Sequence, residues 1–314
     1  MLKDLLETKH CFKLVCGAGN EDIETVKRLV YIYALAGCKF FDLSANEEII
    51  NSAKESLEKA EITDAYLGVS IGIKGDPHSN KAVIDYNKCV NCGSCESICP
   101  QGAIHYAKVK KSKCIGCGRC WKVCPRAAIS YIPEEKKLDE VLPILIKNGI
   151  DCIEFHVDGQ DENEIFTKWK YINNIYNGIL SICISRGKIG DEGLIDRISK
   201  MIATREPYTT IIQADGFPMS GGEDDYKTTL QTVATAEIVQ NANLPIFLVL
   251  SGGTNTKTTQ LAKMCDIKYN GIAIGSYARK IVKKYIERDD FWTNNNVIND
   301  ALETIKPLIK SVSI

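Results

Sequence analysis

The chain has 314 residues, of which 45% are hydrophobic and 25% are charged, and its formal net charge is −1. This near-neutral balance excludes the strongly basic composition typical of nucleic-acid-binding and membrane-surface proteins, so we expect neither partner. The sequence has no run of about 18 apolar residues and no N-terminal secretory signal, which predicts a cytoplasmic protein without a membrane span.

Short apolar runs alternate with amphipathic segments along most of the chain, which is typical of a parallel α/β fold. The runs that we predict as strands are residues 12–17, 39–44, 65–72, 151–157, 179–185, 208–214, 245–251 and 271–275. Eight strands, each followed by a helix, is the number that a closed (β/α)₈ TIM-like barrel requires. An open doubly wound sheet is the alternative, but the sequence lacks the Gly-x-Gly-x-x-Gly run after the first strand that would favour it.

Two cysteine runs follow the third predicted strand. Residues 84–106 and 109–131 repeat each other with an offset of 25, and each contains the spacing Cys-x₂-Cys-x₂-Cys-x₃-Cys-Pro. This is the run of bacterial two-cluster ferredoxins, in which the fourth cysteine ligates the cluster of the other run. A pair of zinc sites is the alternative, but zinc usually takes cysteine pairs separated by a longer gap. The sequence therefore predicts two [4Fe–4S] clusters.

The exchange of the fourth cysteine divides the eight candidate ligands into two sets. We assign the first cluster to Cys89, Cys92, Cys95 and Cys124, and the second to Cys114, Cys117, Cys120 and Cys99.

The cysteine runs also define the predicted domains. These are a discontinuous barrel, a ferredoxin-like insertion and a C-terminal helical extension, at residues 1–79 with 134–288, 80–133 and 289–314 respectively. Because the insertion follows the third strand, it occupies a βα loop. The βα loops of such barrels lie at the C-terminal face, where the active site is found. We therefore expect the clusters to lie beside the barrel mouth.

Polar residues at the predicted ends of the strands are candidates for catalysis. They are Asp42, His78, His156 and Asp215. The two histidines are possible proton donors. Each residue has an ordinary structural explanation, such as an Asp-Gly turn at Asp215, but together they indicate a site at one end of the barrel. Lys13, among apolar neighbours on the first strand, faces either the interior or the rim.

The last two βα loops are candidates for binding a phosphate. They contain Gly252, Gly253, Thr254, Gly275, Ser276 and Arg279. Glycines allow the backbone to approach an anion, the N–H groups of a helix start point at it, and an arginine adds a bidentate contact. A tight turn and a helix N-cap are the simpler explanations. The ligand that we consider is flavin mononucleotide (FMN) or another phosphate-bearing molecule.

Six further segments of the chain have recognisable sequences, at residues 13–18, 33–46, 75–82, 214–222, 251–255 and 275–280. In these segments the chain resembles the cyanobacterial light-dependent period protein family. The resemblance implies an iron–sulfur protein that relays cellular redox state, in cyanobacteria to the circadian clock. We expect cyanobacterial members to depart from the complete first cysteine run found here, so the resemblance favours the redox role over the clock role for this chain.

Two functions are compatible with these features. The first is an oxidoreductase in which the clusters exchange electrons with a small molecule or flavin at the barrel mouth. The alternative is a redox-sensing regulatory protein whose cluster state controls ligand or partner binding. A plain electron carrier would not need a barrel of this size. We favour the oxidoreductase, with an electron donor or acceptor protein as its partner.

Overall fold

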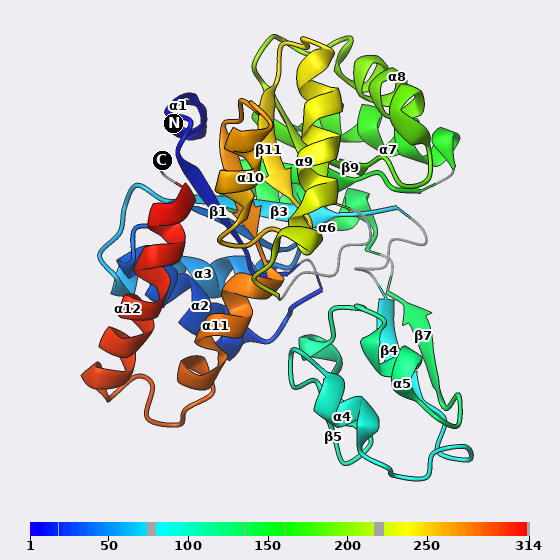
Figure 1. The fold of residues 1–314 in the computed structure, drawn as a ribbon, viewed down its shortest axis with the longest axis vertical. Helices are drawn as coiled ribbons and strands as arrows, with labels where there is room; N and C mark the ends of the chain where they lie inside the picture. The colour runs from blue at the N-terminus through cyan, green and yellow to red at the C-terminus, as the bar shows by residue number, and fades with distance from the viewer. Residues whose placement is uncertain (18, 74–79, 135, 160, 217–222, 313–314) are drawn as a thin grey trace.

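The computed structural model describes residues 1–17, 19–73, 80–134, 136–159, 161–216 and 223–312. Within these residues, eight parallel strands close into a barrel in the order β1-β2-β3-β8-β9-β10-β11-β12 (Figure 1). The strands are β1 (Cys11–Val15), β2 (Phe40–Ser44), β3 (Tyr66–Ile71), β8 (Cys152–His156), β9 (Ile179–Ser185), β10 (Thr210–Asp215), β11 (Phe247–Ser251) and β12 (Gly271–Ile274). The predicted TIM-like barrel is confirmed, and the doubly wound alternative is wrong.

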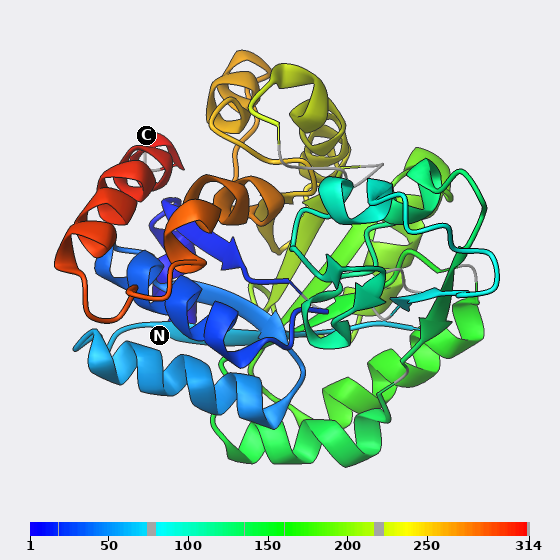
Figure 2. The ribbon, with the colours of Figure 1, turned by 90° about the horizontal axis from the view of Figure 1, so that it is seen from below.

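Helices follow the strands and surround the barrel (Figure 2). They are α2 (Ile23–Leu35), α3 (Glu47–Lys59), α6 (Leu138–Lys147), α7 (Glu162–Ile175), α8 (Gly190–Ile202), α9 (Tyr226–Asn241), α10 (Thr258–Met264) and α11 (Ser276–Ile286). Several begin after an Asp or Asn cap, which fixes where the chain turns from loop to helix. Asp22, for example, accepts a hydrogen bond from the Thr25 N–H at 3.1 Å. The main hydrophobic core lies between the strands and these helices.

Two further helices lie outside the repeating pattern. α1 (Leu2–Glu7) packs its Leu2 and Leu6 side chains into one apolar cluster with Phe40 and Phe247, which closes the N-terminal end of the barrel. α12 (Asn295–Val312) packs on α11 and α2. In the part of the chain that the structure describes, none of the helices combines the length and apolar character that a bilayer span needs.

The cysteine runs form a small separate unit between β3 and α6, at the bottom of Figure 1. Strands β4 (Asn80–Ile84) and β7 (Ile129–Pro133) pair antiparallel, so the chain leaves and re-enters the barrel at adjacent positions. Between them lie α4 (Ser94–Ile98), β5 (Ile104–His105), β6 (Lys108–Val109), a 3₁₀ helix η2 (Lys111–Lys113) and α5 (Arg119–Val123).

The barrel interior changes character from one end to the other. Near α1 it is lined by apolar side chains. Closer to the C-terminal ends of the strands, the interior contains the buried polar side chains of Lys13, Asp42, Glu154 and Gln213. Buried polar groups are costly unless they are paired with each other. The only end of the interior that offers polar chemistry is therefore the C-terminal one, as far as the described residues go.

Candidate functional site

The internal repeat of the insertion is preserved in its backbone. Gly93 and Gly118, 25 residues apart, have φ values of 76° and 77°, and each caps the start of a five-residue helix. Asn91 and Gly116, again 25 apart, also have positive φ. Such left-handed conformations favour Gly and Asn and allow the loop to curl tightly. Each cysteine run thus forms the same curled loop followed by a short helix.

Two cavities among the described residues divide the eight cysteines. One cavity, of about 370 Å³, is lined by Cys89, Cys92, Cys95 and Cys124. The other is lined by Cys99, Cys114, Cys117 and Cys120. Each set takes three cysteines from one run and the fourth from the other run.

The surroundings of the fourth cysteines also repeat. The backbone N–H groups of Ala103 and Ala128 donate to Sγ of Cys99 and Cys124 at 3.2 and 3.3 Å. N–H groups directed at sulfur are a common way in which proteins stabilise iron–sulfur clusters. Four converging thiols with such donors fit a [4Fe–4S] cluster better than they fit a lone zinc ion.

The second cysteine run packs against the C-terminal end of β1. The Glu21 N–H donates to the Ser112 carbonyl at 2.7 Å. Lys81 Nζ donates to the carbonyls of Gly19 and Cys114, at 2.6 and 2.9 Å. Figure 2 views the molecule from this side, with the insertion in front of the barrel. The cavity that contains Cys114 is therefore tied to the β1–α2 loop at the barrel mouth.

Inside the barrel, Lys13 is the centre of a polar cluster. Its ammonium forms an ion pair with Glu154 and donates to Gln213 Oε1 at 2.9 Å. Asp42 Oδ1 lies 3.9 Å from the same nitrogen. Ser70 Oγ donates to Asp42 Oδ1 at 2.7 Å and lies 3.3 Å from Glu154 Oε1. Side chains from five strands thus share one network of charge-assisted hydrogen bonds.

This network fixes the charge states of its members. Burial opposes the charge of Lys13, but Asp42 and Glu154 outweigh burial and raise the pKa of the ammonium. Burial likewise opposes the charge of Glu154, but Lys13 and His156 outweigh it and hold the pKa of that carboxyl well below its usual range. Asp42 is compensated less well, and burial raises its pKa to about 6. Lys13 is therefore a fixed cation and not a nucleophilic amine.

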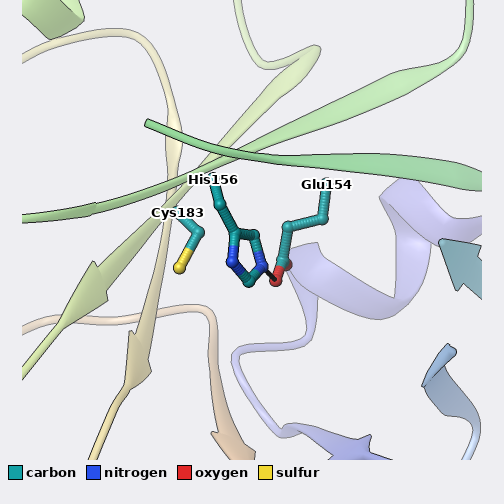
Figure 3. Close-up of side chains that lie close together, drawn as sticks. All are labelled: Glu154, His156 and Cys183. Carbon is teal, nitrogen blue, oxygen red and sulfur yellow. Dashed lines mark hydrogen bonds and ion pairs between the residues drawn. The ribbon is translucent and has the colours of Figure 1, made fainter. Parts of the chain in front are cut away.

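Above this layer, His156 and Cys183 lie next to each other on paired strands (Figure 3). His156 Nε2 lies 3.2 Å from Glu154 Oε1. One sulfur, one nitrogen and one oxygen of Cys183, His156 and Glu154 all lie within 4.8 Å of each other. This set can hold a proton between histidine and carboxylate, or it can hold a metal ion.

The structure brings together only part of the predicted catalytic set. Asp42 and His156 are connected through Ser70 and Glu154. Asp215 ends β10, where it is in register with Ser185 and Ser251. His78 lies outside the described residues.

Sequence reasoning missed Glu154, although it is the main partner of Lys13. The available signal was a glutamate in the middle of the apolar run Asp-Cys-Ile-Glu-Phe-His-Val. A charged residue in the centre of a buried strand is rare unless it is paired. Ser70 and Ser181, which also contact Glu154, gave no comparable signal.

The glycines after β11 lie against other parts of the backbone. Gly252 and Gly253 have φ values of 71° and 81°. A Cβ atom would collide with the Gly216 nitrogen at the first position and with the Thr228 carbonyl at the second. These glycines therefore allow the loop to pack against the start of α9. Beside them, the Thr254 hydroxyl donates to the Ala273 carbonyl.

The predicted anion-binding residues after β12 do lie together. Gly275 and Ser276 start α11, and the guanidinium of Arg279 is buried beneath them, where it donates to the Val15 carbonyl. Its Nε has no hydrogen-bond partner among the described residues. A phosphate or FMN site here stays a prediction, and Ser276 and Arg279 are its best-placed donors.

Comparisons with known proteins agree with both parts of this architecture. A family model described as the light dependent period A C-terminal domain matches residues 144–312, and a model of the 4Fe-4S dicluster domain matches residues 82–131. Light dependent period A of Synechococcus elongatus is 29% identical over 299 residues, which cover 90% of this chain and 84% of the relative. The insertion is therefore an iron–sulfur domain of the dicluster type.

A solved structure shares the barrel fold. The YdjI aldolase from Escherichia coli K12 matches with a TM-score of 0.51 at 6% identity, covering 99% of this chain and 94% of the aldolase. A dihydrodipicolinate synthase from Agrobacterium tumefaciens matches with a TM-score of 0.44 at 10% identity, covering 98% and 84%. At such identities a likeness concerns the fold alone. The C-terminal domain model, in contrast, covers more than half of the sequence, and the chain therefore belongs to the light dependent period A family.

Proposed function

We propose that this chain is a redox protein that holds two [4Fe–4S] clusters and exchanges electrons with a small molecule bound at the C-terminal mouth of its barrel. The eight cysteines that line the two cavities are the proposed ligands. When bound, the clusters supply one-electron transfer. The observation that carries the proposal is the packing of the second run on the β1–α2 loop, because it ties an iron–sulfur site to the end of the barrel that has polar chemistry.

The contact between the barrel and the insertion includes the buried guanidinium of Arg279. Gly17 ends the segment after β1, and a Cβ at this position would lie 3.5 Å from Ile115 of the second run and 3.7 Å from Arg279 Nη1. Arg279 and the second cysteine loop thus flank the same residue. A guanidinium at this place stabilises negative charge on a ligand at the mouth and on the thiolates of the insertion.

The interior side chains supply the proton chemistry of the proposal. His156 is held by Glu154 and is the last residue of β8, at the C-terminal end of the strand. A histidine oriented by a carboxylate can donate or accept a proton near neutral pH. Lys13 keeps Glu154 in position through an ion pair, and Gln213 does so through a hydrogen bond. We therefore assign proton transfer to His156 and ligand contacts to Asp42 and Asp215.

The proposal is tested by following the reoxidation of the reduced protein. Protein purified without oxygen is reduced with dithionite, freed of excess reductant and mixed with candidate acceptors, FMN among them. We expect a His156→Asn variant to reoxidise at least tenfold more slowly, since general acid–base catalysis contributes about 10²–10⁴-fold. Iron content should stay unchanged.

His10→Asn is the matched control, because His10 is exposed just before β1 at the opposite end of the barrel. Equal reoxidation rates in the wild type and both variants would contradict a role for the barrel mouth.

We further propose that a protein partner exchanges electrons at the rim of the first cavity. This cavity contains the exposed Cys92, and its rim carries Val90 and Tyr106, which are 57% and 79% exposed. Residues 80–133 contain nine basic and two acidic side chains, whereas the whole chain has a net charge of −1. An oxidised cluster together with its four thiolates carries a charge of about −2, and the net charge of the insertion stays positive when both clusters are counted. An acidic one-electron carrier is therefore the partner that fits.

The Lys108→Glu/Arg126→Glu double variant tests this partner. Both side chains are exposed, Arg126 lines the first cavity, and Lys108 is in register with His105 next to Tyr106. At low ionic strength we expect stopped-flow reduction by an acidic flavodoxin to slow at least tenfold, because charge steering raises association rates by about 10–10³-fold.

The control Lys306→Glu/Lys310→Glu makes the same charge change on α12, away from the insertion. A similar slowing in both double variants would show a general charge effect and would contradict a docking site at the first cavity.

A redox-sensing role is the second candidate, and Lys81 favours it. Its ammonium joins the Cys114 carbonyl to the Gly19 carbonyl of the barrel, so a change around the second cluster reaches the β1–α2 loop directly. Ligand binding that depends on oxidation state, without any turnover, would favour this role over the oxidoreductase.

A further inference from the structure

We propose that Glu154, His156 and Cys183 form a binding site for a divalent transition-metal ion of the zinc class, inside the barrel and separate from the eight cysteines of the insertion. The cysteine runs do not require this ion. With the ion bound, His156 Nε2 would be a ligand, so the proton transfer assigned to His156 above applies to the metal-free protein.

Strand geometry brings the three donors together. Glu154 and His156 are two residues apart on β8, so both side chains point to the same face of the strand, which is the barrel interior. Cys183 on β9 is in register with His156. Figure 3 shows the imidazole between the carboxylate and the thiol. Because all three residues are buried and lie on strands of one closed sheet, the site is rigid and not a chance grouping on a loop.

The donor types suit such an ion, and so does the spacing of the His156 and Glu154 donors. Proteins bind zinc through cysteine thiolates, histidine imidazoles and carboxylates. A catalytic zinc site has three such protein ligands and leaves the fourth coordination position for water or substrate. Two ligands bound tetrahedrally at about 2.0–2.1 Å lie about 3.3 Å apart. His156 Nε2 and Glu154 Oε1 are 3.2 Å apart. Metal binding would replace this hydrogen bond, and the Cys183 thiol, which lies within 4.8 Å of the other two donors, would have to turn toward the ion.

Neighbouring groups hold the carboxylate as they do in other metal sites. Ser181 donates to Glu154 Oε2 at 3.2 Å, on the side that is ion-paired with Lys13, and Gln213 Nε2 donates to Oε1 at 3.0 Å. Partners that orient a ligating carboxylate are a regular feature of metal centres.

Charge balance points in the same direction. Among the described residues, three carboxylates are buried along the interior and its mouth, at Asp42, Glu154 and Asp215, against the ammonium of Lys13 and the guanidinium of Arg279. A divalent cation would compensate this excess of negative charge and would favour the thiolate form of Cys183.

Zinc uptake is the test. Protein purified without oxygen is dialysed against ⁶⁵Zn²⁺, and zinc, iron and sulfide are measured per chain. We expect one zinc per chain in addition to the full iron content. His156→Gln and Cys183→Ser should each weaken zinc binding at least tenfold, since even loss of an orienting partner costs about 10–100-fold. Cys265→Ser is the matched control, because Cys265 is exposed and lies outside the barrel.

Zinc K-edge X-ray absorption on the wild type gives a result that does not depend on how the variants fold. A zinc ion at the proposed site has one sulfur neighbour at about 2.3 Å and nitrogen or oxygen neighbours at about 2.0 Å. Zinc that has entered the ferredoxin cysteines instead has three or four sulfur neighbours. A sulfur-only shell, no zinc uptake, or unchanged uptake in both variants would overturn the metal site and leave the redox proposal standing.

Discussion

Replacing Cys99 with serine is expected to remove the iron of the second site, although Cys99 belongs to the first cysteine run. The reason is the exchange of the fourth ligand, because Cys99 lines the same cavity as Cys114, Cys117 and Cys120. Cys124→Ser should remove the iron of the first site in the same way. Each variant should keep roughly half of the about eight irons expected for two clusters. Iron and sulfide analysis, with electron paramagnetic resonance of the reduced protein, measures this loss.

Pairs of substitutions determine which cysteines share a cluster. Cys92 and Cys124 line one cavity, so Cys92→Ser/Cys124→Ser should still keep about half of the iron. Cys92→Ser/Cys99→Ser should keep almost none. The opposite pattern would mean that each run ligates its own cluster, and equal loss in both pairs would mean that the sites are not independent. Cys265→Ser, outside both cavities, should keep all of its iron.

Replacing Lys13 with methionine is expected to destabilise the protein by about 3–5 kcal/mol, the typical cost of removing one partner of a buried ion pair. The substitution leaves Glu154 buried without its cation, and Asp42 loses its only nearby ammonium among the described residues. Urea denaturation followed by circular dichroism measures the free energy of unfolding. Lys39→Met is the control, because the Lys39–Asp64 pair is exposed and should contribute about 1 kcal/mol or less.

The Lys13→Met/Glu154→Gln double variant shows how much of the lost stability comes from leaving the Glu154 carboxylate without its cation. It removes both members of the pair, so it should regain part of the stability lost in Lys13→Met.

The ion pair also makes stability depend on pH. In the wild type the pKa of Glu154 is lowered, so the contribution of this carboxylate to the free energy of unfolding is present above its ordinary pKa and is lost as the pH falls. A Lys13→Met variant within about 1 kcal/mol of the wild type would contradict the central role of this lysine.

The strands and the cysteine runs could be predicted from the sequence because their signals are local. A strand buried on both faces is a short apolar run, and all eight runs correspond to strands of the barrel. The ferredoxin spacing is likewise a property of one loop and one helix start, and its 25-residue repeat reappears in the φ values of Gly93 and Gly118.

The composition of the interior site was decided by the tertiary structure. In a closed barrel both faces of a strand are buried, so apolar patterning does not reveal which face is the interior. Lys13 and Glu154 are 141 residues apart and meet only because the sheet closes. Only the folded chain shows that the second cysteine run lies on the β1–α2 loop, because that contact depends on how the insertion packs and not on any local pattern.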